Sequence, residues 1–435
     1  MHNPLSLVLA FTLLLPGLVS AAPTPEPSYP RFNRYSQHKI QRVNAGVKVK
    51  DGAKAVRATY AKFGWSKPTE DFATGYVYAP SPGVASDSAN TSGQTGTDAN
   101  HPTSYDTEYL APVTIGGQTI LMDFDTGSSD FWVMNEKTPA SETRGHEIFN
   151  STKSSTFQLM PGSTFSISYG DGAAAEGIVG TDTVNIGGAT VTSQAVELAT
   201  SVSAEFAQNP QTNGLLGMAF SNINTVSPNQ VNTFFDNVSP TLALPVFTAN
   251  LKHATTGAYE FGFIDSTQFV GEIAYTPVDS DQGFWQFDSI SFSINGGPVQ
   301  TNTDGSPAIA DTGTSLLFVD PVVATAYYDK VAGAVDDPQA GGTVFPCDSN
   351  LPDIQLAMGD GYMGTIPGSG LSYASINSTH CLGALQSNSG SGLQIFGDIM
   401  FKAQFVVFDN GAQQIGFAPH VNMTLQTSSL VAAIR

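Results

Sequence analysis

The sequence predicts an all-β protein built from two related lobes with a cleft between them. From residue 105 onward, short runs of β-branched and aromatic residues alternate with Gly, Asn and Asp turns. Charged residues make up only 12% of the 435-residue chain and glycine occurs 43 times, which favours strands and turns over long helices. With 41% hydrophobic residues, the chain can bury a core large enough for more than one lobe.

An internal repeat is the evidence for two lobes. Asp-Thr-Gly occurs at 125–127 and again at 311–313. Each copy is followed, at a similar distance, by two bulky apolar residues and a glycine, at 215–217 and 395–397. The sequence therefore predicts one lobe over 104–290 and a second over 291–435.

A few regular elements can be placed inside these lobes. Residues 163–182 predict a hairpin, because apolar residues alternate up to Tyr169 and a Gly-Asp-Gly turn follows. Helices are expected at 229–238 and at 320–331, the second with Asp320 as N-cap and Pro321 at its first position.

The N-terminal region has the composition of a removable leader. Residues 1–21 predict a secretory signal peptide, with an apolar run and small residues at a cleavage site. Residues 22–103 are then expected to form a basic propeptide, partly helical over 52–65, that ends in an exposed linker over about 79–103. The alternative is an ordinary disordered N-terminal extension.

Charge is divided unevenly between this leader and the rest of the chain. The net charge is −20, but ten of the 17 Lys and Arg residues precede residue 105, against six acids there. The acidic remainder would repel nucleic-acid phosphates, so nucleic acid is excluded as a partner. After the signal peptide no segment is long and apolar enough for a membrane span, and the C-terminal tail is too short for a lipid-anchor signal, so no membrane anchor is expected.

The secretory route gives meaning to the cysteines and to the glycosylation sequons. An oxidising compartment favours a disulfide between Cys347 and Cys381 over two free thiols, which are the alternative. Five N-x-S/T sequons are candidate glycosylation sites, at Asn90, Asn150, Asn237, Asn377 and Asn422. We expect a secreted, extracellular protein, with a vacuolar location as the alternative.

Two acids in matched settings predict general acid-base catalysis. If the lobes face each other, Asp125 and Asp311 meet, and like charges at hydrogen-bond distance share one proton. Such a pair can deprotonate a water molecule and protonate a carbonyl oxygen in one step, without metal or cofactor. Gly127 and Gly313 let the backbone approach closely and offer N–H groups to the carboxylates. Hydroxyl groups complete each frame: Thr126 and Thr312 across the interface, Ser128 and Thr314 at the outer carboxylate oxygens.

These motifs resemble the pepsin family of aspartic proteases, of the secreted fungal aspergillopepsin and penicillopepsin type. The resemblance rests on the two Asp-Thr-Gly motifs, the sequence Tyr-Gly-Asp-Gly at 169–172 and the tail "IFGDIMFKAQFVVFDNGAQQIGFAP", and it covers about residues 105–420. It implies a bilobal fold, an acid endopeptidase made as a zymogen, protein and peptide substrates, and the propeptide as intramolecular inhibitor. It also implies catalytic Asp125 and Asp311, a disulfide in the C-terminal lobe, and a chain that acts as a monomer.

The same resemblance assigns further residues. Tyr169 is expected on a flap hairpin with its hydroxyl near the Trp132 indole nitrogen, and Gly170, Asp171 and Gly313 are expected to pair with the substrate backbone. Asp123 and Asp171 line the position of the residue before the scissile bond, which implies acceptance of Lys beside large apolar residues. The chain departs from the family at Ala173, where Lys-accepting relatives have Ser, and at Asn213, where relatives often have Asp.

Other function classes fit the sequence less well. A non-catalytic binder on the same lobes would not need both Asp-Thr-Gly motifs and the flap tyrosine. A glycosidase also uses two acids, but gives no reason for the twin frames. A zinc hydrolase is disfavoured because the seven histidines form no H-E-x-x-H motif.

Overall fold

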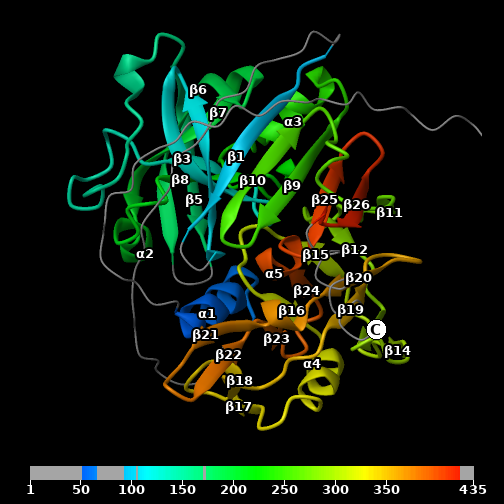
Figure 1. Cartoon of the computed structure of the whole chain (residues 1–435). Helices are drawn as coiled ribbons and strands as arrows, with labels where there is room; N and C mark the ends of the chain where they lie inside the picture. Colours follow the sequence, from blue (N-terminus) through cyan, green and yellow to red (C-terminus); the bar gives the residue numbers. More distant parts are fainter. Residues whose placement is uncertain (1–50, 66–92, 104–105, 170–172, 422–435) are drawn as a thin grey trace, which may run out of the picture. The chain divides into compact units, whose positions relative to one another are not determined.

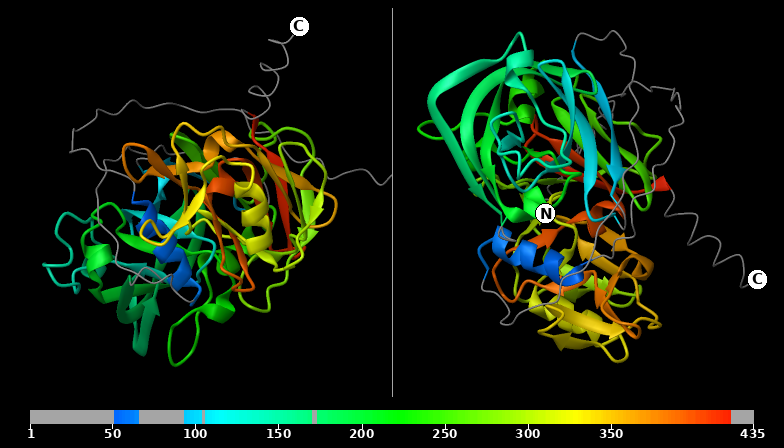
Figure 2. Two further views of the ribbon diagram at one scale, coloured as in Figure 1. Left: turned by 90° about the horizontal axis from the view of Figure 1, so that it is seen from below. Right: turned by 90° about the vertical axis from the view of Figure 1, so that its left-hand side faces the viewer.

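The computed structural model describes residues 51–65, 93–103, 106–169 and 173–421. Strands dominate these residues, and the helices are short (Figure 1). In both views of Figure 2 the strands coloured cyan and green gather on one side and those coloured yellow and orange on the other. The predicted all-β fold with two lobes is confirmed.

The largest sheet runs through both halves of the sequence. Within the described residues it has thirteen strands, in the spatial order β11 (Ala274–Pro277), β26 (Gln414–Pro419), β25 (Gln404–Asp409), β9 (Val246–Lys252), β10 (Thr255–Phe261), β1 (Gly96–Pro102), β2 (Tyr109–Ile115), β3 (Gln118–Asp125), β8 (Gly214–Gly217), β4 (Phe131–Val133), β7 (Ala189–Val202), β6 (Ala174–Ile186) and β5 (Gln158–Ser168). The C-terminal strand β25 pairs with β9, and the rings of Phe408 and Phe247 stack there at 4.3 Å.

Three smaller sheets are formed by the later part of the chain. The first contains β12 (Gln286–Phe287), β15 (Ala308–Ala310), β24 (Gln394–Phe396), β16 (Leu317–Val319) and β23 (Leu385–Ser387). The second contains β14 (Gln300–Thr301), β13 (Ser291–Ile294), β19 (Ile354–Ala357) and β20 (Met363–Ile366). The third contains β17 (Val335–Asp337), β18 (Gly342–Pro346), β22 (His380–Gly383) and β21 (Ser372–Ser375).

The helices connect strands or cover their ends. They are α1 (Gly52–Lys62), α2 (Ala204–Ala207), α3 (Phe234–Val238), α4 (Pro321–Tyr328) and α5 (Asp398–Phe401), with 3₁₀ turns η2 (Ser151–Lys153), η3 (Ser221–Ile223), η4 (Ser239–Thr241) and η5 (Gly368–Gly370). Across the described residues, none of the helices combines the length and hydrophobicity that a membrane span requires.

Predicted and observed helices differ mainly in length. The helix expected at 229–238 begins only at Phe234, because the Thr233 hydroxyl accepts the Asp236 N–H and caps the helix there. The helix expected at 320–331 has Pro321 at its first position as predicted, and ends at Tyr328.

Helix α1 forms where the basic leader was expected to be helical. The Asp51 carboxylate accepts the Lys54 N–H at 2.9 Å and caps the start. The end is closed by Gly64, which has φ +68°, a conformation that favours glycine. One side of the helix is buried, with Val56 2% exposed, and Figure 1 shows it beside β21 and β22.

The linker prediction for residues 79–103 is wrong in its last part. Residues 96–102 form β1, which pairs with β10 on one side and, at its end, with β2 on the other. The sequence "GTDANHP" has few residues that favour strands, but tertiary contacts hold it. Asn100, which is fully buried, donates to the Asn250 carbonyl and accepts the Gly257 N–H.

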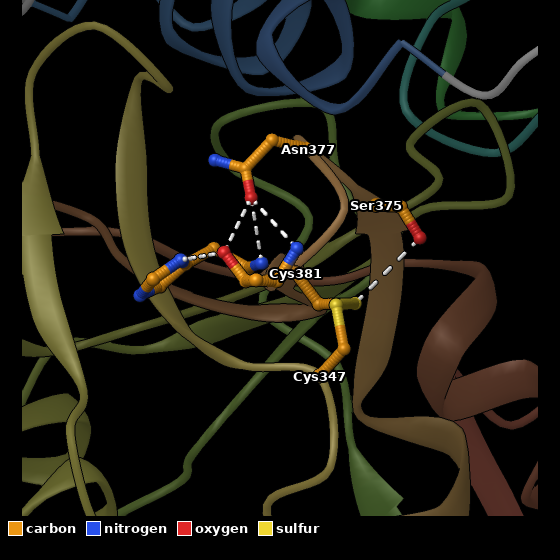
Figure 3. Close-up of a disulfide and its surroundings, with 6 residues drawn as sticks. Cys347, Ser375, Asn377 and Cys381 are labelled. Atoms are coloured by element: carbon orange, nitrogen blue, oxygen red, sulfur yellow. Dashed lines mark hydrogen bonds between the residues drawn. A yellow bond between two sulfur atoms is a disulfide. The ribbon is translucent and has the colours of Figure 1, made fainter.

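The predicted disulfide is present. Cys347 and Cys381 are bonded with a Cα–Cα distance of 5.0 Å, in the usual range (Figure 3). It closes a loop of 34 residues, which in the chain-entropy model stabilises the fold by roughly 3–4 kcal/mol.

Candidate active site

The two Asp-Thr-Gly segments leave strands of two different sheets in equivalent ways. Asp125 ends β3, which runs parallel to β8, and Asp311 directly follows β15, which runs parallel to β24. The glycines that end the repeated apolar pairs lie where these chains pass closely. A side chain at Gly217 would collide with the backbone of Ser129 and Asp130, and one at Gly397 with the Thr314 and Leu316 carbonyls. The repeat therefore reflects a packing requirement.

Reciprocal hydrogen bonds join the two segments. The Thr126 N–H donates to the Thr312 hydroxyl at 3.1 Å, and the Thr312 N–H donates to the Thr126 hydroxyl at 2.9 Å. Each hydroxyl in turn donates to a carbonyl of the opposite segment, of Ala310 at 2.8 Å and of Phe124 at 2.5 Å. These buried contacts fix the position of one aspartate against the other.

Each carboxyl group is held by its own frame. The Gly127 N–H donates to Asp125 Oδ1 at 2.8 Å, and the Ser128 hydroxyl to Oδ2 at 2.7 Å. Around Asp311 the Gly313 N–H and the Thr314 hydroxyl make the same bonds at 3.0 and 2.5 Å.

The inner oxygens of the two aspartates face each other. The two carboxyl groups lie within hydrogen-bonding distance. A side chain at Gly127 would collide with Asp311, and one at Gly313 with Asp125. The two glycines are thus required for the approach of the acids.

A lysine from α1 occupies the space between the aspartates. Lys62 Nζ lies 2.8 Å from Asp125 Oδ1 and 2.9 Å from Asp311 Oδ1, and its side chain is only 10% exposed. The resemblance implied that the propeptide inhibits the protease but did not indicate which of its residues reaches the acids. Lys62 differs from the other leader lysines in directly preceding the Phe-Gly turn that ends the helix, a signal that was overlooked.

Burial and the charge of Lys62 give the two acids different pKa values. Burial would raise the pKa of Asp125, but the Lys62 charge, with hydrogen bonds from Asp311, Lys62 and Ser128, lowers it overall. Burial raises the pKa of Asp311 to about 6, with the Lys62 charge opposing the rise and the Asp125 charge adding to it. Burial alone would lower the Lys62 pKa, but the two carboxylates raise it.

Tyr169, which was predicted to lie on a flap hairpin, is hydrogen-bonded to Trp132. The Trp132 indole N–H donates to the Tyr169 hydroxyl at 2.9 Å. The Tyr169 N–H donates to the Ala173 carbonyl at 2.7 Å and closes the turn between β5 and β6. Phe206 packs edge-on against both aromatic rings and was missed from the sequence, because α2 lies far along the chain. Gly170 and Asp171 lie outside the described residues.

Asp123 lies on the same strand as Asp125 and is buried. It is 8% exposed, and its Oδ1 has no hydrogen-bond partner among the described residues. Burial, then the charges of Glu108, Asp125 and Asp398, raises the Asp123 pKa well above its usual range.

The departure at Asn213 has a structural explanation. Its side chain donates to the Leu121 carbonyl at 3.1 Å and accepts the Glu147 N–H at 2.9 Å. An ionised aspartate could not make the first of these bonds.

Three sequons fall within the described residues. Asn150 and Asn237 are partly buried, and Asn237 donates to the Gln194 side chain at 2.8 Å. Asn377 is exposed; Figure 3 shows its carbonyl oxygen turned toward Thr379 and His380 and its amide nitrogen pointing away. Asn90 and Asn422 lie outside the described residues. In the part of the chain that the structure describes, no cluster of three or more His, Cys, Asp or Glu side chains is arranged to hold a metal ion.

Comparison with known proteins settles the family. The family model described as eukaryotic aspartyl protease matches residues 108–420, well over half of the chain. The chain belongs to the eukaryotic aspartyl protease family. This protease is therefore a hydrolase that acts on protein or peptide substrates.

Among its relatives are several fungal enzymes. Penicillopepsin-1 of Penicillium janthinellum is 49% identical over 74% of this protease and 98% of the relative. An aspergillopepsin A-like aspartic endopeptidase of Aspergillus fumigatus is 44% identical over 94% of this protease and 97% of the relative. Aspergillopepsin-1 of Aspergillus oryzae is 43% identical over 92% and 95%. The predicted resemblance to the aspergillopepsin and penicillopepsin type is confirmed.

Proposed function

We propose that this protease is an acid endopeptidase in which Asp125 and Asp311 are the catalytic residues. The observation that carries the proposal is the pair of carboxyl groups at hydrogen-bond distance, each in an equivalent frame of Gly N–H and hydroxyl donors. A shared proton makes one member a base and the other an acid at the same time.

The reaction follows from this division. The ionised carboxylate takes a proton from a water molecule while the water oxygen attacks the peptide carbonyl carbon. The carboxylic acid gives its proton to the carbonyl oxygen, so no charge builds up there. As the tetrahedral intermediate collapses, the departing nitrogen takes the proton of the protonated carboxyl group, a hydroxyl of the intermediate gives its proton to the other carboxylate, and the C–N bond breaks. The carboxyl groups end with one proton between them, ready for the next cycle.

The activity is tested with a protein substrate over a range of pH. We expect the acid-activated protease to cleave denatured haemoglobin below about pH 6, because one carboxyl group of the pair must keep its proton. Cleavage should be blocked by a statine inhibitor and abolished in Asp125→Asn and Asp311→Asn. An acid-activated wild-type protein that binds the substrate or the inhibitor without cleaving would instead identify a non-catalytic binder.

We further propose that residues 51–65 hold the protease latent at neutral pH. Lys62 forms ion pairs with both carboxylates, and its charge helps to lower the pKa of Asp125. Docking of the segment is therefore favoured when Asp125 is ionised. The contact stabilises the docked segment above the ordinary Asp pKa and is lost as pH falls through the lowered value. Acid therefore weakens the plug, and cleavage of the leader then makes the release permanent.

The cleavage that releases the leader is expected between residues 65 and 93. The buried strand β1 supports an end of the removed segment before residue 93 rather than at 103. We propose that residues 1–21 direct secretion to the outside of the cell, with the vacuole as the alternative destination. N-terminal sequencing of the mature product and its recovery from culture medium test both points, and an N-terminus after residue 96 would contradict the first.

The residue before the scissile bond is proposed to be large and apolar, with lysine as an accepted alternative. Asp123 is a buried acid two residues before Asp125, and Asp171 was predicted beside it. Burial that raises the Asp123 pKa weakens its attraction for lysine, as does the lack of a hydroxyl at Ala173. Matched peptides with Lys, Phe or Leu before the scissile bond decide the question, and no cleavage after Lys would end the claim.

Asn377 is the strongest of the proposed glycosylation sites. A glycan attaches to the amide nitrogen, which points away from the hydrogen-bonded carbonyl oxygen at the exposed Asn377 and is engaged with Gln194 at Asn237. The mass of Asn377→Gln should fall by one glycan relative to wild type, and an unchanged mass would remove this site.

A further inference from the structure

A pocket in the C-terminal half of the chain holds the side chain of Tyr60, one helical half-turn before Lys62. The ring is only 4% exposed and lies edge-on to Phe318, with ring centres 5.8 Å apart. Its hydroxyl donates to the Ser387 carbonyl at 2.8 Å and lies 2.6 Å from Ser389 Oγ. The pocket thus combines an aromatic wall with two polar atoms at the position of a phenol oxygen.

The polar end of the pocket is built by contacts that do not involve Tyr60. The Asn388 side chain donates to Asp320 at 2.7 Å and to the Leu393 carbonyl at 3.0 Å, which anchors the loop. The Ser389 N–H donates to the Ser387 hydroxyl at 3.0 Å, and Ser389 has φ +54°. A non-glycine residue in this conformation needs support from its surroundings. The Ser389 hydroxyl is therefore held in place by its own loop.

The pocket adjoins the catalytic aspartates. Phe318 lies on β16, which pairs with β24, and β24 pairs with β15, the strand that leads into Asp311. The same short segment that fills the pocket with Tyr60 reaches both carboxylates with Lys62. Next to the pocket is a cavity of about 630 Å³, lined in part by Phe63, Phe284 and Leu393.

We propose that the pocket of Phe318, Ser387 and Ser389 becomes a substrate subsite that selects tyrosine once residues 51–65 have left. This inference rests on the proposed function, because the leader must dissociate for the pocket to open. A substrate tyrosine would place its hydroxyl where the Tyr60 hydroxyl lies and would exchange its bonds to water for bonds to Ser387 and Ser389. Phenylalanine fits the aromatic wall equally well but leaves both polar atoms without this partner.

The test compares Tyr and Phe in otherwise identical peptides, placed in turn at each of three positions on either side of the scissile bond. For the acid-activated wild type we expect one position at which kcat/KM favours Tyr by about 2- to 12-fold, the effect of one net hydrogen bond. In Ser389→Gly this ratio should fall below the wild-type value but stay above one, because the Ser387 carbonyl remains as an acceptor for the tyrosine hydroxyl. Glycine removes the hydroxyl and adopts the positive φ without strain.

Two further variants make the result specific. Ser391→Gly is the control, because it removes a hydroxyl from the same loop and should keep the wild-type ratio. Ser389→Ala removes the Ser389 hydroxyl without introducing glycine, so it covers the case in which glycine disturbs the loop. A ratio of about one at every position in the wild type, or a Tyr preference that is undiminished in both Ser389 variants, would overturn the subsite. Wild-type protein that cleaves none of the peptides would instead reject the proposed function, which separates the two failures.

Discussion

A pair of buried acids makes the stability of this protease depend on pH. Asp130 and Glu197, respectively 0% and 1% exposed, hydrogen-bond to each other behind the flap tyrosine. Thr225 donates its N–H and its hydroxyl to Asp130, and Asn224 donates to Glu197 at 3.1 Å. Because two buried carboxylates cannot both be charged at this distance, Glu197 carries the proton.

This pair predicts a loss of stability toward neutral pH. Burial first, and then the Asp130 charge, raises the Glu197 pKa well above its usual range. An acid whose pKa is raised by folding stabilises the fold below its ordinary pKa, and the contribution is lost as pH rises through the raised value.

Replacing Glu197 by an uncharged isostere should remove this pH dependence. Glu197→Gln keeps a donor for Asp130, and we expect the difference between its Tm at pH 4 and pH 7 to shrink by several degrees. Glu176→Gln, on the exposed face of the neighbouring strand β6, is the matched control and should behave as wild type. Equal Tm differences in all three proteins would contradict the role given to the pair.

In the proposed latent form, helix α1 has two roles: one side of the helix docks on the protein, and Lys62 blocks the aspartates. Its buried side, with Val56 and Tyr60, packs on the C-terminal half, and its last residue reaches the aspartates. The docking contacts of Val56 and Tyr60 are apolar packing and neutral hydrogen bonds, so they keep their strength when the acids become protonated, whereas the Lys62 contacts do not. We therefore expect the pH dependence of latency to come from the Lys62 contacts and not from the rest of the helix.

Removing the lysine charge should make activation easier. Lys62→Ala loses charge-assisted hydrogen bonds worth about 1.5–3 kcal/mol each, so we expect the full-length protein to activate at least ~10-fold faster at pH 6. The rate is followed by the loss of full-length protein on gels and by cleavage of a fluorogenic peptide. Lys54→Ala, exposed on the same helix, serves as control. Activation of Lys62→Ala no faster than this control would show that the plug does not depend on the charge.

At the scale of the whole molecule, the two halves are joined at the aspartates by the reciprocal threonine bonds. Thr312 Oγ1 donates to the Phe124 carbonyl and accepts the Thr126 N–H, and all three groups are buried. Removing this one hydroxyl leaves two buried backbone groups without a partner.

Loss of these threonine hydrogen bonds should therefore lower the stability of the protein even when the substituted side chain keeps the shape of threonine. For Thr312→Val we expect the free energy of unfolding to be about 2–6 kcal/mol lower than in wild type, since each of the two unsatisfied groups costs about 1–3 kcal/mol. Scanning calorimetry at one scan rate measures the change in Tm. Thr301→Val, exposed on β14, should leave Tm nearly unchanged. A Tm for Thr312→Val equal to that of the control would mean that the joint contributes nothing to stability.

The sequence predicted a feature correctly where the feature depends on adjacent residues or on the two cysteines of the chain. The frames around Asp125 and Asp311 follow from adjacent Gly, Ser and Thr residues, and two cysteines in a secreted chain leave one pairing. The position of Lys62 depends on contacts with Asp125 and Asp311, which lie 63 and 249 positions further along the chain, and its one local signal is its place directly before the Phe-Gly turn. Strand β1 was mistaken for linker because its residues disfavour strands and its neighbours alone hold it.

The equivalence of the two Asp-Thr-Gly frames has a consequence for how this enzyme behaves on dilution. In a twofold dimer each subunit would supply one acid, and activity would vanish once the subunits separated. Here a single polypeptide supplies both, so the proposed catalytic pair stays together at any concentration. Because the two halves belong to one chain, their sequences can differ. Ser128 is at the position equivalent to Thr314, and the acid Asp123 is at the position equivalent to the apolar Ile309. A substrate therefore meets an asymmetric site and has only one preferred direction in which to bind.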